Sequence, residues 1–195
     1  MIPASPAQLA ECLSVAQALV TTVTPQQWTM PTPCADWDVY ALLTHVVSGN
    51  QLFADILTGR TTVDEFRGRP ARDVLGDRPS AAFQDCAQTV VAAFELPGVL
   101  DRPVTVPFGT VPGMVALHLR ITEILVHGWD LARALGQPVD FDDTVAAQEL
   151  QFIRRALTQM PPERAPFAAP TPVPPTATAI DQLVALLGRS VTTPG

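Results

Sequence analysis

Four ionisable residues share one face of a largely apolar stretch, HLRITEILVHGWDLARALG. On a helical wheel of about 100° per residue, one narrow stripe holds all four: Arg120, Glu123, His127 and Asp130. A glutamate and a histidine four residues apart bring a carboxylate beside an imidazole. These groups could ligate a divalent metal, or they could pair as a ladder of charges. The wheel alone leaves both interpretations open.

A second histidine, His45, lies midway along another predicted helix, in the stretch ALLTHVVSG. Small residues on its helix face, Ala41 and Gly49, leave room beside the imidazole. Together with Glu123 and His127 it makes a His₂Glu set, and three such ligands with an open position are typical of catalytic zinc. Ligand type alone leaves nickel, iron or manganese open. The alternative for His45 is a buried histidine that bonds a carbonyl or a carboxylate.

The composition indicates one core-rich domain. The chain has 195 residues, of which 47% are hydrophobic and 16% charged, and its mean hydropathy is +0.21. A net charge of −7 argues against a nucleic-acid partner, which would normally meet a basic patch. The few basic residues are scattered, so no patch for an anionic membrane is expected either.

The cysteines and the N-terminal stretch predict a cytoplasmic protein. Cys12, Cys34 and Cys86 form no CxxC pair and are odd in number, which favours a reducing compartment. The first residues lack the basic region of a signal peptide and include Glu11. No run of 18 apolar residues occurs, so we expect no transmembrane helix.

Apolar residues recur with a period near 3.6, which predicts a mostly helical chain. We expect Ser5 to cap the first helix, Asp36 the second and Ser80 the third. Gly59 closes the second helix, and a loop or hairpin rich in Pro and Gly precedes the fourth. The remaining predicted elements are helices over about 114–135, 141–158 and 178–188, with Gly136 after the first of them and an extended Pro-rich segment over 161–175.

Four long helices around one core predict an all-α fold, an antiparallel four-helix bundle with extra C-terminal helices and a Pro-rich wrap. We expect residues 1–160 to form the bundle with one added helix. Residues 161–195 would supply the Pro-rich segment and a short C-terminal helix packed on the bundle. Bundles of this kind place ligand and metal sites between facing helices.

Three stretches resemble one protein family. WTMPTPCADWDVYALLTHVV and ITEILVHGWDLARALG resemble the two signatures of the mycothiol-dependent maleylpyruvate isomerase-like proteins, a branch of the DinB-like metal-binding bundles. The closing DQLVALLGR resembles the C-terminal end of a single-domain actinobacterial subgroup. The resemblance implies a DinB-like four-helix bundle with a divalent metal, usually zinc. The family's metal ligands fall on His45, Glu123 and His127.

The resemblance also implies thiol chemistry. A metal with an open position can hold mycothiol, or another low-molecular-weight thiol, as a thiolate that attacks an electrophile, as in a transferase or an isomerase. Larger relatives often carry a separate C-terminal domain, whereas only residues 136–195 follow the signature helix here, which argues against maleylpyruvate as the substrate. A non-catalytic module that binds metal or a small ligand is the alternative, so enzyme activity stays open. A homodimer is compatible with this fold, although no residue pattern indicates one.

Two residues of the stripe have supporting roles in this hypothesis. Arg120 could bind a substrate carboxylate as a catalytic group; its alternative is an ion pair with Glu123 or Asp130. Asp130 could orient a metal ligand; its alternative is a cap or a pair with Arg133.

Other polar or aromatic residues near the motifs carry weaker signals. Trp37 and Trp129 read as packing anchors, although Trp37 could wall a pocket. Cys34 could approach the mouth of the site, with a small loop residue as the alternative. His118 lies about 140° from Glu123 on the wheel, so it is not expected in the site.

Overall fold

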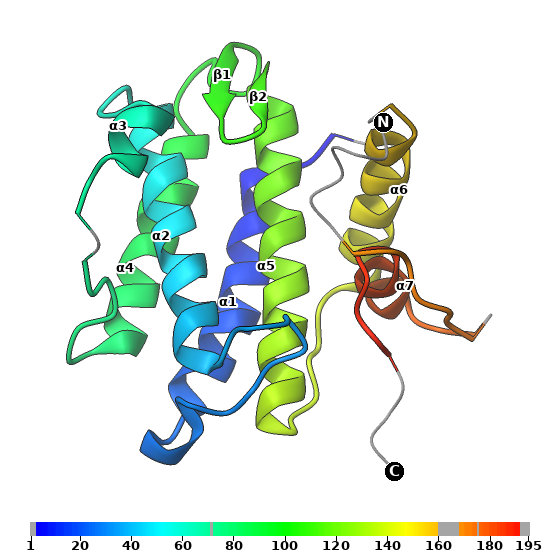
Figure 1. The fold of residues 1–195 in the computed structure, drawn as a ribbon. Coiled ribbons are helices and arrows are strands. Elements are labelled where there is room, and N and C mark those ends of the chain that lie inside the picture. Colours follow the sequence, from blue (N-terminus) through cyan, green and yellow to red (C-terminus); the bar gives the residue numbers. More distant parts are fainter. Residues whose placement is uncertain (1–2, 71, 160–167, 175, 192–195) are drawn as a thin grey trace.

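Four long helices form the centre of the protein (Figure 1). They are α1 (Pro6–Thr22), α2 (Val39–Leu57), α4 (Pro79–Phe94) and α5 (Gly113–Leu135). The structure is a computed structural model that describes residues 3–70, 72–159, 168–174 and 176–191. Helices α1 and α2 each pack against both α4 and α5, which closes the ring of a bundle. The predicted four-helix bundle is therefore confirmed.

Two helices of the bundle run one way and two the other. Figure 1 shows α1 and α5 descending while α2 and α4 ascend, so α2 and α4 are parallel neighbours. Parallel neighbours need a long connection, and residues 58–78, with the short α3 (Val63–Arg67), return the chain along the outside. The sequence predicted a loop or a short helix in this segment, and both are present.

Short elements close the two ends of the bundle. The single turn η1 (Pro25–Gln27) follows α1. Strands β1 (Pro103–Val106) and β2 (Gly109–Pro112) pair antiparallel in a small hairpin ahead of α5, as the alternating Val and Thr residues predict. The fold is thus helical apart from this hairpin within the described residues.

Helices α6 (Asp143–Gln159) and α7 (Ala179–Leu186) lie together beside α5, outside the ring of four. They are the extra C-terminal helices that the sequence predicts. Gly128 of α5 makes room for the segment that leads into α6, because a Cβ there would lie 2.5 Å from Cζ of Phe141. Most of the predicted Pro-rich wrap falls outside the described residues, and its described part, 168–174, is neither helix nor strand.

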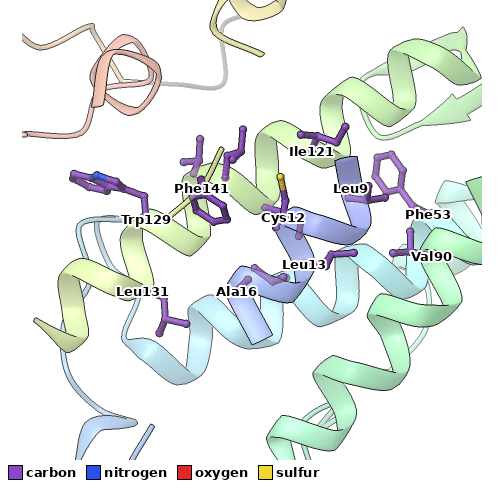
Figure 2. Packing of buried hydrophobic residues seen from close by; sticks show 14 of the residues in the cluster. Leu9, Cys12, Leu13, Ala16, Phe53, Val90, Ile121, Trp129, Leu131 and Phe141 are labelled. Atoms are coloured by element: carbon purple, nitrogen blue, oxygen red, sulfur yellow. The ribbon is translucent and has the colours of Figure 1, made fainter. Parts of the chain in front are cut away.

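Helix α5 is buried on almost every side. Figure 2 shows Leu9, Leu13 and Ala16 of α1 among the apolar residues of the core, with Ile121 and Leu131 of α5 nearby. Helices α2, α6 and α7 cover its other faces. A charged group on α5 must therefore find a partner inside the protein, because burying it alone costs on the order of several kcal/mol. No helix in the described ranges is both long enough and apolar enough to cross a membrane.

The helix caps predicted for α1 and α2 have different outcomes. Ser5 caps α1 as predicted, and its Oγ accepts a hydrogen bond from the N–H of Gln8 at 3.3 Å. The prediction for α2 is wrong: Asp38, not Asp36, is the cap, and its Oδ1 accepts from the N–H of Ala41 at 2.8 Å. Asp36 instead occupies a left-handed turn with φ of 68°, a conformation that aspartate tolerates better than most residues.

The predicted cap of α4 is also wrong. The helix begins at Pro79, whose ring presets the first helical φ, and the residue before it makes no side-chain cap. Ser80 therefore lies inside the helix, where its Oγ accepts a hydrogen bond from Nε2 of Gln17 at 2.8 Å. At the end of α5, Gly136 adopts φ of 65° and stops the helix where the sequence predicts.

Candidate metal centre

Three side chains from α2 and α5 converge at the interface of the two helices. Oε2 of Glu123 lies 3.0 Å from Nε2 of His45 and 3.5 Å from Nε2 of His127. One ligand atom from each of the three residues lies within 4.8 Å of the other two. Residues 78 positions apart in sequence, His45 and Glu123, thus meet. The structure brings together the trio that the helical wheel and the family resemblance indicate.

These separations suit a small divalent cation. Zinc bonds of about 2.0–2.2 Å to histidine nitrogen and carboxylate oxygen imply roughly 3.4 Å between neighbouring donors of a tetrahedron. The two distances from Glu123, 3.0 and 3.5 Å, bracket this value. Two imidazoles and one carboxylate are also ligand types that zinc and nickel accept. The residues therefore fit the metal that the resemblance implies.

The imidazole of His127 lies between two carboxylates. Its Nδ1 is 3.1 Å from Oδ2 of Asp130, and its Nε2 faces Glu123. Burial alone would lower the pKa of His127, but the hydrogen bonds to Asp130 and Glu123 raise it overall. Asp130 is fully buried and also pairs with Arg189. Its alternative partner, Arg133, lies instead over the ring of Trp129, 4.9 Å from the centroid.

Glu123 is held as a carboxylate. Burial would raise its pKa, but hydrogen bonds to His127 and His45 and the charge of Arg120 hold that pKa well below its usual range. The side chain keeps 26% of its surface exposed, so a ligand can approach it. This combination of an ionised carboxylate and partial access is what a metal ligand requires.

Arg120 lies deeper than the trio. Only 2% of its side chain is exposed, and its NH2 is 3.9 Å from Oε2 of Glu123. Among the described residues, its Nε and NH2 have no hydrogen-bond partner. Burial lowers its pKa, and Glu123 opposes that effect. Gly49 gives the guanidinium its space, because a Cβ there would lie 2.5 Å from NH1.

The loop before α2 places Trp37 against the two candidate histidines. Its base is closed by the isolated bridge between Pro31 and Asp38 and by the hydrogen bond from Thr32 N–H to the Trp37 carbonyl at 3.1 Å. The Trp37 ring then lies 4.6 Å from the ring of His45 and 5.7 Å from that of His127. Trp37 is therefore a wall of the site as well as a packing residue.

Cys34 also approaches the centre. Its thiol, His127 and Asp130 form a second group whose candidate ligand atoms lie within 4.8 Å of one another. Burial raises the pKa of this thiol, and Arg189 opposes the shift. Because Asp130 already binds Arg189 and Nδ1 of His127, the group that contains Glu123 is the better candidate for metal binding.

The other two cysteines are packing residues. Cys12 and Cys86 are each 3% exposed. Burial raises their pKa values to about 12 and about 11, so both are neutral thiols at physiological pH.

The third histidine serves a different contact on the opposite side of α5. Nδ1 of His118 lies 2.8 Å from Oε1 of Glu149 in α6, and both side chains are fully buried. Oγ1 of Thr122 donates to the other carboxylate oxygen at 3.1 Å. The ring of His118 stacks on Phe152 with centroids 4.6 Å apart. This polar cluster joins α5 to α6 and is separate from the candidate metal centre.

Arg189 is the polar residue at the site that sequence reasoning missed. It lies in the closing DQLVALLGR stretch. The family resemblance of this stretch assigns no role to any of its side chains. No periodicity connects it to Asp130, 59 positions earlier, so only the docking of the C-terminal segment reveals the contact.

The model for the mycothiol maleylpyruvate isomerase N-terminal domain matches residues 9–132. The chain belongs to this family. The matched residues include the whole candidate trio and Asp130, but they end before α6, α7 and Arg189. The family assignment that the two signature stretches indicate is therefore confirmed.

Two relatives in the family come from Mycobacterium tuberculosis. They are named "Uncharacterized protein Rv0738" and "Uncharacterized protein MT0763". Each is 37% identical to this chain over 175 residues, which cover 89% of this chain and 91% of the relative. Because 89% of the chain is covered, the similarity extends past the matched domain and includes α6.

Two solved structures share the fold. They are crystal structures of the mycothiol-dependent maleylpyruvate isomerase and of a single-residue mutant of it, each with a TM-score of 0.58. Sequence identities are 17% and 16%, and the likeness covers 74% of this chain. It spans 65% of the length of the isomerase, so part of that enzyme has no counterpart in the matched region.

Proposed function

We propose that this protein binds a divalent metal, zinc or a similar ion such as nickel, through His45, Glu123 and His127. The observation that carries the proposal is the convergence of three donor atoms from two helices at distances that match a coordination shell. Three protein ligands would leave a position for a small molecule, as in catalytic zinc sites. Glu123 and the mouth beside Trp37 provide the exposed side from which that molecule enters.

We further propose that the small molecule is a thiol of the mycothiol type. The family and the structurally similar enzyme are both named for mycothiol. A bound zinc ion would favour the thiolate form of such a thiol at neutral pH. In an addition to an electrophilic double bond, sulfur forms a C–S bond and the thiol proton ends on the product, so no further reactant is needed. The loop wall at Trp37 would hold the organic part of the thiol and exclude water.

The two remaining stripe residues act on the ligands in this proposal. Asp130 holds Nδ1 of His127, which turns Nε2 toward Glu123. Arg120 lies behind Glu123, and its charge adds to the hydrogen bonds with His127 and His45 that lower the pKa of this carboxyl group. At 2% exposure Arg120 is placed to support Glu123 and not to grip a substrate carboxylate. We therefore assign both residues positioning roles.

Elemental analysis tests the metal. Purified wild-type protein, reconstituted with zinc and dialysed, should retain about one equivalent per chain, because the two candidate ligand groups share His127. A double variant with His45→Ala and His127→Ala should retain almost none. Glu123→Gln should also lose metal. Its matched control is Glu95→Gln, at an exposed glutamate, which should keep it. Equal metal in wild type and double variant would contradict the proposal.

Thiol consumption tests the chemistry. The zinc-loaded protein is incubated with mycothiol and a panel of electrophilic alkenes, and the loss of free thiol is compared with that of the metal-free protein. We expect faster consumption only with metal. A crystal soaked with the thiol should show sulfur about 2.3 Å from zinc. Metal binding without thiol binding or consumption would instead support the alternative, a non-catalytic metal-binding module.

A further inference from the structure

An arginine from the C-terminal segment reaches the candidate metal centre. Nε and NH2 of Arg189 donate to the two carboxylate oxygens of Asp130, at 3.3 and 3.0 Å. The Arg189 side chain is 12% exposed and that of Asp130 is fully buried. A two-pronged guanidinium–carboxylate contact fixes the plane of the carboxylate as well as its position.

The same carboxylate also orients a histidine. Oδ2 of Asp130, which accepts from Arg189, lies 3.1 Å from Nδ1 of His127. An imidazole that donates from Nδ1 presents the lone pair of Nε2, and here Nε2 faces Glu123. A series of contacts therefore leads from Arg189 through Asp130 to His127, whose Nε2 is the candidate ligand atom.

The C-terminal segment has other anchors that do not involve Asp130. Nε1 of Trp129 donates to Oδ1 of Asp181 in α7 at 3.1 Å. NH2 of Arg154 in α6 donates to Oε1 of Gln182 at 3.3 Å. The docking of α7 can thus be perturbed separately from the Arg189 contact.

We propose that Arg189 is a positioning residue of the metal centre. It holds Asp130, which holds His127 with Nε2 directed at the metal. The inference rests on the proposed metal-binding function and extends the centre beyond residues 9–132, the part that matches the family model. The C-terminal segment, which the family domain does not include, then completes the site.

Zinc affinity tests the proposal directly. We compare wild type, Arg189→Gln, Arg189→Lys and the control Arg154→Gln by competition with a chromophoric chelator. Arg189→Gln should bind zinc about 10–100-fold more weakly, the usual effect of removing a group that orients a ligand. Arg189→Lys keeps the charge without the fork and should be intermediate. Arg154→Gln should match wild type, and circular dichroism confirms that each variant is folded.

A double-variant cycle separates positioning from docking. In an Asp130→Asn background, the added Arg189→Gln should change zinc affinity by less than about threefold, because both changes break the same line of contacts. A role confined to docking α7 would give additive losses. Wild-type affinity in Arg189→Gln, or full additivity in the cycle, would overturn the proposal.

A spectroscopic readout keeps this inference apart from the proposed function. Long-range nitrogen–proton correlation NMR of chelator-treated protein, in alkaline buffer, reports the tautomer of His127. We expect the Nδ1–H form alone in wild type and in Arg154→Gln, and a mixture in Arg189→Gln. If wild type binds no zinc, the proposed function fails, while the tautomers still decide the role of Arg189. An unchanged tautomer in Arg189→Gln would refute it.

Discussion

The buried contact between His118 and Glu149 gives the sharpest stability prediction. Glu149 accepts from His118 at 2.8 Å, from Thr122 at 3.1 Å and from Gln148 at 3.3 Å, and it is fully buried. Glu149→Ala removes the acceptor and leaves these three donors buried without that hydrogen-bond partner. Breaking a buried pair in this way costs about 3–5 kcal/mol in free energy of unfolding. For a chain of this size, each kcal/mol lowers the midpoint of thermal unfolding by about 2–4 °C. That midpoint should therefore fall by roughly 6–20 °C.

Urea unfolding followed by circular dichroism measures this cost. The matched control is Glu11→Ala, an exposed glutamate in mid-helix, which should change stability by less than about 0.5 kcal/mol. Replacing both partners, with His118→Leu and Glu149→Leu, should cost less than the sum of the single changes, because neither member of the His118–Glu149 pair is then left buried without the other. Zinc affinity should stay unchanged in the Glu149 variants.

Three results would refute this reasoning. A cost below about 1 kcal/mol for Glu149→Ala would show that the cluster is not a buried polar contact. Additive costs in the His118 and Glu149 pair would show that the two side chains do not interact. Loss of zinc in Glu149→Ala at full stability would mean that the cluster belongs to the metal centre after all.

Three further changes test other parts of the structure. Gly49→Ala should lower the free energy of unfolding, measured in urea, by about 1–3 kcal/mol and should weaken zinc binding. The reason is that the new Cβ would lie 2.5 Å from the guanidinium of Arg120. Unchanged stability and zinc binding would contradict this close contact. Asp38→Ala should lower the free energy of unfolding by about 1 kcal/mol through loss of the α2 cap, whereas Asp36→Asn should be nearly neutral. The reverse order would support Asp36 as the cap. In chelator-treated protein the raised pKa of His127 adds stability below about pH 6.5, the unfolded value, and this stability is lost as pH rises through the folded value. The difference in urea midpoint between wild type and His127→Gln should therefore shrink toward alkaline pH, and growth of that difference would contradict the assignment.

Two members of the candidate trio were accessible from sequence because helical geometry brings them together. Glu123 and His127 lie one turn apart on one helix, so their proximity follows from spacing alone. His45 was grouped with this pair from its residue type and its small neighbours, and the family resemblance supported the grouping. His118 lies five residues before Glu123, about 140° away on the wheel, and the structure places it against Glu149 of α6 on the other side of α5.

What the sequence missed depends on backbone turns and on long-range docking. Asp36 and Asp38 both precede α2, and only the left-handed turn at Asp36 shows that Asp38 is the cap. The parallel course of α2 and α4 follows from the connection over 58–78, whose path no local pattern encodes. Arg189 meets Asp130 only once α7 has packed beside α5.

Trp37 makes the candidate centre optically visible. Its indole lies 4.6 Å from the ring of His45 and 5.7 Å from that of His127. An excited indole so close to these rings should lose fluorescence when a paramagnetic ion such as nickel or cobalt binds, or when an imidazole gains a proton. The other two tryptophans, Trp28 and Trp129, would contribute a steadier background. The loop that shields the site thus supplies a built-in reporter, with which metal entry could be followed in unlabelled protein within milliseconds of mixing.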